Sequence, residues 1–383
     1  MPRLRHYACL LFLGAAATPE SYALLTFNDG KDKILVQGTY SFGYDTNIFT
    51  QRVAKGAVSQ AYSVSLTYNR KAGIIGVSAA TSMSHNVFSG VSGQNFYDPN
   101  LSLAFTKGTG RTTGSLSLQG TKSDVPDPIA NNRAESWLYS STLDLRYFLN
   151  SRYFLTDTAE YSATDYTNKI LFSNLQSYND NLAINYRYDS KLDLNASSNL
   201  GYSTTKNIKA TSYGLNFGSV GTILSKLSGT TNFGYEISND SYARNLVGAS
   251  GKRSDSFSSF RSATSLTWRP KTSFGLTATL DKDFSISSTD VKTNTLQAGL
   301  TSDFALFQRF KTSIGGNYTG TVFLGPLSQG RRDRLYQVFV NVGTALTTHI
   351  RVNLEYAYMV NYSTLAVGHF TRQLLTLAIT ATY

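Results

Sequence analysis

Side chains that could perform acid–base or metal chemistry are few and scattered in this chain. Beyond residue 23 the histidines are His85, His349 and His369, and the surrounding patterns place all three in loops or turns. No two of them have the short spacing of a metal site, and none lies on a strand where it could orient a nucleophilic serine. The carboxylates form no pair that separates a general acid from a general base, and no glycine-rich phosphate loop precedes a helix. The sequence therefore predicts no enzyme, no metal and no cofactor.

The first 23 residues form a segment distinct from the rest. Arg3 and Arg5 precede an apolar run over 7–17, and small residues ending at Ala23 provide a cleavage site. This is the pattern of a secretory signal, whose apolar run is too short to span a bilayer. The lone Cys9 lies inside it, which excludes a disulfide framework in the mature chain. We expect a signal peptide at 1–23 and a single domain at 24–383, because no linker or composition break divides the remainder.

The remaining chain is poor in charge and rich in aromatic residues. Charged residues make up 15% of the sequence and hydrophobic residues 41%, with 25 Tyr and 22 Phe. Apolar and polar residues alternate along most of it; in 350–362, for example, Leu354 and Tyr356 face one way and Glu355 the other. No apolar run has the length of a spanning helix, and a closed barrel is the other structure that satisfies its backbone in lipid. We expect an all-β fold, a transmembrane antiparallel up-and-down barrel; a soluble sandwich or propeller would explain the alternation alone.

About 18 amphipathic segments have the length that a tilted membrane strand requires, and a slip of two strands would give 16. The segments are expected at 33–45, 60–69, 73–84, 98–107, 111–122, 136–148, 152–163, 177–188, 191–204, 208–218, 226–238, 256–268, 272–285, 291–304, 309–321, 334–346, 350–362 and 371–383. Longer loops are expected at 46–59, 85–97, 123–135, 164–176, 239–255 and 322–333. Tight turns lie between them, and short turns face the periplasm in bacterial barrels. An even number of strands also returns both chain ends to the periplasm.

Aromatic side chains fall near both ends of these segments, where amphipathic rings lie at the level of lipid headgroups. The outer belt holds Tyr40, Phe42, Tyr44, Trp137, Tyr358 and Tyr362. The inner belt holds Tyr147, Tyr153, Tyr186, Tyr188, Trp268, Phe274, Phe310 and Tyr383. The two belts favour the membrane barrel over a soluble β-protein.

Charged residues on the polar face of the strands are expected to line the lumen. A basic residue at the lipid midplane costs about 2 to 4 kcal/mol, so a hydrated interior explains their placement. The predicted lining is balanced in charge and could line an aqueous channel or form ion pairs that stiffen the wall. It comprises Asp144, Arg146, Arg187, Asp193, Glu236, Arg261, Asp281, Asp303, Lys311, Arg351, Glu355 and Arg372.

The net charge of +11 is concentrated elsewhere, largely in the short turns. Such a periplasmic ring could attract an anionic solute or polymer to the opening, or could anchor the barrel to phospholipid headgroups. The sequence does not choose between the two. The predicted ring comprises Arg70, Lys71, Lys107, Arg111, Arg152, Lys191, Arg269, Lys271 and Arg309.

A second set of basic residues falls in the predicted outer loops. Arg331, Arg332 and Arg334 surround Asp333, and Lys252-Arg253 lies in another loop. These groups could contact lipopolysaccharide phosphates or an acidic glycan, although solvated loop charge is the ordinary explanation. Nucleic acid is not an expected partner, because the charge is dispersed around the predicted barrel.

Three short stretches resemble known outer-membrane signals. The last strand alternates through Leu377 and Ile379 to a terminal Tyr383, and resembles the signal read by the barrel assembly machinery. The stretches 43–48 (GYDTNI) and 186–194 (YRYDSKLDL) resemble the β-barrel porin 2 family, whose members often accompany exopolysaccharide export. That resemblance implies an outer-membrane barrel and partners among polysaccharide-export components.

The sequence thus leads to three hypotheses for function. The first is an outer-membrane channel that exports an extracellular polysaccharide, a cargo implied only by the resemblance. The second is a general or weakly anion-selective diffusion porin, with loop 46–59 or 239–255 folded back to narrow the lumen. The third is a structural or adhesive barrel without transport. All three place the mature chain in the outer membrane of a Gram-negative bacterium, among lipid and lipopolysaccharide.

Overall fold

The protein is described by a computed structural model that covers residues 24–383 apart from 72, 92, 244–253 and 308. The predicted signal peptide lies outside the described residues, as does Lys252-Arg253. Within the described residues no helix is long and apolar enough to cross a membrane. The elements are β1 (Leu25–Phe27), β2 (Asp32–Asp45), β3 (Ala57–Arg70), β4 (Gly76–Ser89), β5 (Phe96–Lys107), β6 (Thr112–Asp127), β7 (Asn132–Phe148), β8 (Tyr153–Tyr166), β9 (Leu175–Arg187), β10 (Leu192–Thr204), β11 (Ile208–Leu224), β12 (Leu227–Tyr242), β13 (Ser254–Lys271), β14 (Phe274–Ile286), β15 (Lys292–Leu306), β16 (Phe310–Leu324), β17 (Arg332–Ala345), β18 (Ile350–Ser363), the 3-10 helix η3 (Ala366–Gly368) and β19 (Phe370–Thr382).

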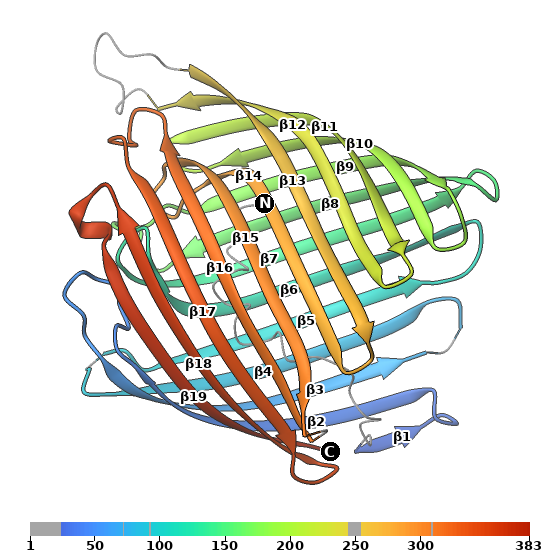
Figure 1. The fold of residues 1–383 in the computed structure, drawn as a ribbon, viewed down its shortest axis with the longest axis horizontal. Helices are drawn as coiled ribbons and strands as arrows, with labels where there is room; N and C mark the ends of the chain where they lie inside the picture. Colours follow the sequence, from blue (N-terminus) through green and yellow to red (C-terminus); the bar gives the residue numbers. More distant parts are fainter. Residues whose placement is uncertain (1–23, 72, 92, 244–253, 308) are drawn as a thin grey trace.

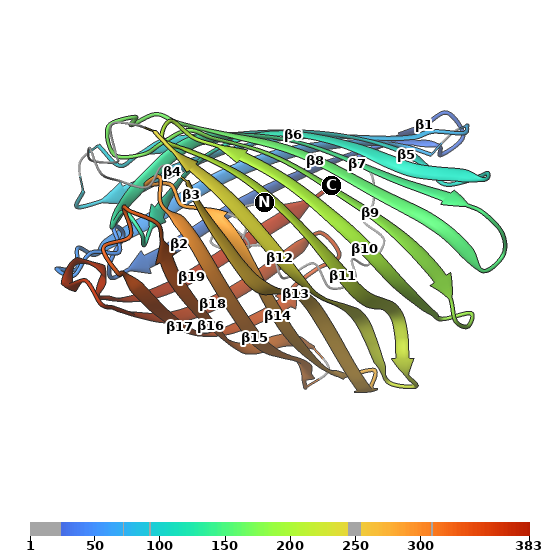
Figure 2. The ribbon, with the colours of Figure 1, turned by 90° about the horizontal axis from the view of Figure 1, so that it is seen from above.

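Strands β2 to β19 form a closed antiparallel barrel of 18 strands (Figure 1; Figure 2). Each strand pairs with the next along the chain, and β19 pairs with β2 over Leu374↔Asp45 to Thr382↔Gln37. The last residue completes this seam, because the amide of Val36 donates to the carbonyl of Tyr383 at 2.7 Å and the amide of Tyr383 donates back at 2.8 Å. Closure leaves no long sheet edge exposed to lipid.

All eighteen expected strand segments are present, which confirms the predicted fold class. Several strands run further toward the loop end than expected, so β4 reaches Ser89 and β6 reaches Asp127. His85 therefore lies within β4 and not in a loop, and its imidazole stacks on Tyr97 of β5. The short β1 was not predicted; it pairs with β2 at Leu25↔Ile34. The sequence alternation underestimates strand length where a strand leaves the membrane, because polar residues then occupy both faces.

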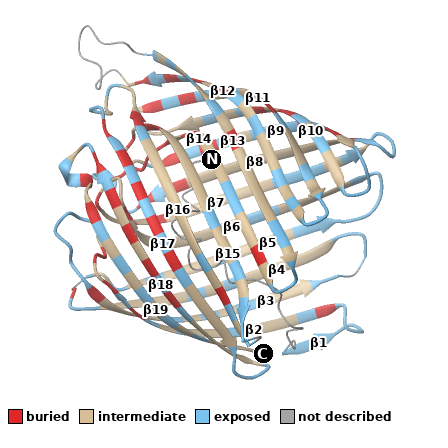
Figure 3. Cartoon of the chain, in the orientation of Figure 1, coloured by how far each residue is buried: buried red, intermediate tan, exposed pale blue. Residues whose placement is uncertain are grey.

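The outer surface of the barrel is apolar. On β18 the side chains of Leu354 and Tyr356 are 46% and 40% exposed, whereas Glu355 between them is 6% exposed. The same alternation runs through β9, where Leu182 and Ile184 face outward. Buried residues gather toward the loop end and along β17 and β18 (Figure 3). The barrel thus presents apolar side chains to its surroundings and polar ones to its interior, as a membrane barrel does.

Candidate functional site in the barrel lumen

The twelve charged residues expected in the lumen all face the interior. Directly paired residues on adjacent antiparallel strands point to the same side of the sheet. Because Glu355 points inward, its partners on the neighbouring strands also point inward, and the same step can be repeated around the barrel. Glu355 pairs with Thr376 of β19, and Gly43 of β2 pairs with Thr376 in turn. Continuing around the barrel places every member of the predicted set on the inner face: Asp144, Arg146, Arg187, Asp193, Glu236, Arg261, Asp281, Asp303, Lys311, Arg351, Glu355 and Arg372.

Many of these charged side chains form ion pairs or ring contacts with other residues of the barrel wall. Near the turn end, Asp193 lies 3.6 Å from Arg187 and 3.9 Å from Arg146. The guanidinium of Arg146 also lies over the ring of Phe154, 4.1 Å from its centroid. Near the loop end, Arg372 forms a bidentate pair with Asp45 across the β19–β2 seam, at 2.6 and 3.0 Å. The lumen is therefore polar but has much of its charge neutralised within the wall.

The sheet opens locally between β13 and β14. Their pairing ends at Ser262↔Lys282, although β13 continues to Ser254 and β14 to Ile286. The β14–β15 hairpin is defined here as residues 283–295. Beyond Lys282, toward the loop end of the barrel, this hairpin packs against the inner face of β12 and β13. Asn294 donates to the hydroxyl of Ser259 on β13 at 3.0 Å. The hairpin thus lies inside the lumen and not in the wall.

Buried polar and apolar contacts hold the hairpin there. The ammonium of Lys292 donates to Ser238 at 2.8 Å and lies 3.5 Å from the carboxylate of Asp240, both on β12. Ile286 joins a buried cluster with residues of β9, β11 and β12, including Ile208 and Tyr242. These partners are two or more strands away from β14, which they could reach only if the hairpin folds inward.

The tip of the hairpin contacts the tip of the β6–β7 hairpin and the β8–β9 loop. The hydroxyl of Ser288 donates to the carboxylate of Asp127 at the end of β6, and the amide of Ser173 donates to the carbonyl of Ser288 at 2.8 Å. Strand β6 is eight positions from β14 in a barrel of 18. The β6–β7 hairpin also turns inward, since the pairing of β5 with β6 ends at Asn100↔Thr121 although β6 continues to Asp127, so the two hairpins meet within the mouth. The lumen is narrowed by this hairpin. The sequence prediction named loops 46–59 and 239–255 for this role, and residues 244–253 lie outside the described part.

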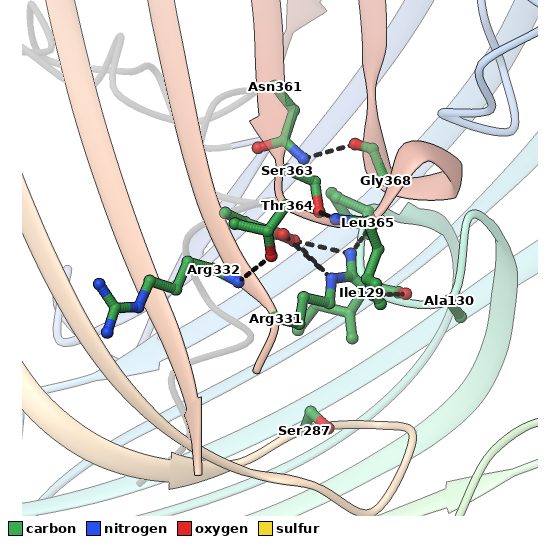
Figure 4. Close-up of polar contacts among 12 residues, drawn as sticks. Ile129, Ala130, Ser287, Arg331, Arg332, Asn361, Ser363, Thr364, Leu365 and Gly368 are labelled. Carbon is green, nitrogen blue, oxygen red and sulfur yellow. Dashed lines mark hydrogen bonds and ion pairs between the residues drawn. The ribbon is translucent and has the colours of Figure 1, made fainter. Parts of the chain in front are cut away.

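A second crossing connects the β6–β7 loop with the β16–β17 loop (Figure 4). Arg331 donates to the backbone carbonyls of Ile129 at 2.8 Å and Pro128 at 3.3 Å, and forms a bidentate pair with Asp333. Gln51 of loop 46–56 joins it by donating to the carbonyl of Asn131 at 3.1 Å. Arg331 is therefore buried in the structure, and the expectation that it contacts lipopolysaccharide is wrong. Arg332 and Arg334 are exposed on the outer face.

Below the hairpin lies a cavity of 240 Å³ lined by β8 to β15. The guanidinium of Arg261 lies between two acids of this cavity. Its Nε is 3.4 Å from a carboxylate oxygen of Glu236 and 3.8 Å from one of Asp283. The remaining polar lining is mainly amide and hydroxyl: Thr158, Asn179, Asn181, Asn199, Ser203, Ser212, Asn232 and Ser285. Sequence reasoning named Glu236 and Arg261 but missed the asparagines, because their importance depends on strands that meet only in the barrel.

No protein-family profile matches this chain, and no curated protein of similar sequence was found. Among solved structures, Acinetobacter baumannii OccAB1 has a TM-score of 0.50 and 11% identity, over 96% of this chain and 100% of that one. OccK2 (OpdF) of Pseudomonas aeruginosa gives 0.49 and 10% over 92% and 97%, and OpdK with vanillate gives 0.48 and 10% over 91% and 99%. At this identity the likeness shows the fold alone. The resemblance to the β-barrel porin 2 family gains no support from these comparisons.

The protein is a β-barrel of the Gram-negative outer membrane. Its closed sheet and apolar exterior leave the bilayer as the matching environment, and short turns at one end and longer loops at the other match the bacterial arrangement. By that arrangement the crossed mouth faces outward. Among the described residues no group of His, Cys, Asp or Glu is placed to hold a metal ion.

The predicted basic ring lies at the turn end, at the opposite end from the crossed mouth. Its members sit in or beside the turns that join β3–β4, β5–β6, β7–β8, β9–β10, β13–β14 and β15–β16: Arg70, Lys71, Lys107, Arg111, Arg152, Lys191, Arg269, Lys271 and Arg309. The guanidinium of Arg111 lies 4.9 Å above the ring of Tyr147, which faces outward. Arg70 and Lys107 also lie on outward-facing positions of their strands. For Arg70, Lys107 and Arg111 this placement favours contact with lipid headgroups over lining of the opening.

Proposed function

We propose that this protein is a diffusion channel for small polar solutes, narrowed near its outer mouth by the β14–β15 hairpin. The observation that carries the proposal is the contact of Ser288 with Asp127, which joins the β14–β15 hairpin to the inward-turned tip of the β6–β7 hairpin, whose strand β6 is eight positions away in an 18-stranded barrel. A barrel of this size is too wide to be filled by side chains from its own wall. An inserted hairpin then sets the size of solute that passes.

Single-channel conductance in planar bilayers tests this proposal. The variant replaces residues 287–291 with a two-residue Asn-Gly turn, which joins paired strands without an extended tip. We expect steady conductance in the unaltered protein and a conductance at least twofold larger in the variant. Equal conductance of the two proteins, or none in either, would contradict the proposal. A barrel with a structural or adhesive role would remain closed in both.

Export of an extracellular polysaccharide is a less favoured candidate. A polymer must pass the mouth as a continuous chain, and both the hairpin and the β6–β7 loop cross its path. No comparison supports this cargo. A deletion strain that loses secreted exopolysaccharide, with export components and an anionic glycan recovered alongside the barrel, would favour export over solute diffusion.

The basic residues and the last strand suggest further partners. We propose that Arg332 and Arg334, exposed above the outward-facing Tyr362, contact lipopolysaccharide phosphates. We also propose that Leu377, Ile379 and Tyr383, which lie exposed on the outer face of β19, form the signal for the barrel assembly machinery. Loss of lipopolysaccharide co-purification on Arg332→Ala with Arg334→Ala, and loss of membrane assembly on Tyr383→Ala, are the tests.

A further inference from the structure

Asparagine side chains form a continuous polar surface on the inner face of β9 to β12. Asn181 of β9 pairs directly with Asn199 of β10. Asn216 of β11 then donates from its amide to the carboxamide oxygen of Asn199 at 3.0 Å and to the hydroxyl of Ser197 at 3.4 Å. Adjacent strands thus contribute carboxamides to one connected surface, and Asn181 and Asn199 line the cavity below the hairpin.

Glycines on the neighbouring strands let these carboxamides lie flat. A Cβ placed on Gly214 would meet the carboxamide oxygen of Asn199 at 2.7 Å, and one on Gly201 would meet that of Asn179 at 3.0 Å. Each asparagine carboxamide therefore lies over a glycine of the next strand, in the space that a side chain at the glycine position would occupy. The amide groups are therefore presented along the wall without projecting far into the lumen.

The two bases that line the cavity are both paired with acids. Arg261 serves Glu236 and Asp283, and Lys292 serves Asp240. The lining acids Glu160 and Asp180 have no ion pair among the described residues, and Asp180 lies on an outward-facing position of β9. An anionic solute would meet no unneutralised base here. The acids exceed the bases, because Arg261 alone faces both Glu236 and Asp283 and Glu160 adds a further carboxylate.

The unsatisfied groups of this surface are hydrogen-bond acceptors. The carboxamide oxygen of Asn232, which lines the cavity, and that of Asn216 beside it accept no hydrogen bond within the described structure. Asn216 is 1% exposed, and buried polar groups normally have a partner. These two oxygens are covered by the wall, so a solute hydroxyl would instead meet the amides and hydroxyls that line the cavity, to which it can donate and from which it can accept at the same time.

We infer that this cavity is a binding subsite for a neutral polyhydroxylated solute, a sugar or a polyol of about monosaccharide size. The flat amides supply alternating donors and acceptors, the pairing of both lining bases disfavours anions, and 240 Å³ falls below the roughly 300 Å³ at which pockets for drug-sized ligands begin. The inference rests on the proposed diffusion channel, in which this subsite lies on the solute path.

Saturation-transfer NMR of the folded full-length protein in detergent tests the subsite without requiring conduction. The probes are D-glucose and D-mannitol, with succinate and putrescine as anionic and cationic comparisons. We expect saturation transfer to the first two only. Asn199→Leu should raise the dissociation constant for glucose about fivefold or more, the effect of losing one or two hydrogen bonds.

Asn317→Leu is the matched control. Asn317 of β16 lies over Gly299 of β15 in the same manner, with 2.6 Å between its oxygen and a Cβ placed there, but does not line the cavity. It should leave glucose binding unchanged while circular dichroism reports the folding of both variants. Absent glucose transfer, stronger transfer to succinate or putrescine, or equal losses in the two variants would overturn the subsite. Absent conductance with intact glucose binding would instead overturn the diffusion channel.

Discussion

The guanidinium of Arg331 donates to the backbone carbonyl of Ile129 at 2.8 Å, although 202 residues separate them in the chain. The same guanidinium forms a bidentate pair with Asp333 and lies 4.7 Å above the ring of Phe323. One side chain of the β16–β17 loop thus holds β16, β17 and the β6–β7 loop together. Because charge-assisted hydrogen bonds to backbone are short and directional, this contact fixes where the β6–β7 loop crosses the mouth.

Arg331→Ala should release the β6–β7 loop and leave Asp333 buried without its partner. We expect larger and more frequent current fluctuations in planar bilayers, together with a loss of about 2 to 4 kcal/mol in unfolding free energy. Arg332→Ala is the control, because Arg332 is exposed and neighbours the same strand end. Equal current traces for the two variants would contradict a role for Arg331 in holding the mouth.

Lys292→Met should loosen the β14–β15 hairpin. The substitution keeps the length of the side chain but removes the charge that neutralises Asp240, which is 1% exposed. Leaving one buried charge unpaired costs about 3 to 5 kcal/mol. Urea unfolding in lipid vesicles measures the loss, and Lys292→Met combined with Asp240→Asn should recover a large part of it. A double variant as unstable as the single one would show that the pair does not determine hairpin stability.

Gly234→Ala should destabilise the barrel because a Cβ at this position meets the carboxamide of Asn216 and the carbonyl of Leu215. Backbone cannot move aside within a paired sheet, so the expected cost is about 1 to 3 kcal/mol. Gly38→Ala is the matched control on β2, where a Cβ meets nothing within 4 Å. Gly38→Ala should leave stability unchanged or slightly raised. The prediction is wrong if both variants unfold at the same urea concentration.

The alternation of the sequence predicted the barrel and the inward facing of residues such as Asp144 and Arg372, because both depend on a period of two within each strand. It did not predict the inserted hairpin. Alternation places Ile286 and Lys292 on the outward face of their strands, and nothing local tells whether that face meets lipid or the inner wall of β12. The sequence did contain one indication of the inserted hairpin. Lys292 and Asn294 are polar, although they lie on the same face of β15 as the apolar Leu296 and Leu300. The asparagine surface was missed for a related reason, since Asn199 and Asn216 meet only through the register.

Asp157 of β8 and Asp180 of β9 lie on the outward face of the barrel, and their carboxyl groups interact with each other. Their neighbours on this face are apolar, among them Leu182, which pairs with Asp157, and Leu200, which pairs with Asp180. Carboxylates facing lipid are unfavourable, although less so than Lys or Arg. Replacing both with leucine should therefore raise the unfolding free energy in lipid vesicles by about 1 to 2 kcal/mol.

Asp144→Leu is the control for that double variant, because Asp144 faces the lumen and accepts hydrogen bonds from Thr158 at 2.9 Å and Ser115 at 3.3 Å. Leucine there removes the acceptor and should lower stability. The double variant should raise the unfolding free energy and Asp144→Leu should lower it, because the first two residues face lipid and Asp144 faces the lumen. If Asp157→Leu with Asp180→Leu instead lowered stability, the acid pair would be stabilising its surroundings, and this part of the outer face would not be a simple lipid contact.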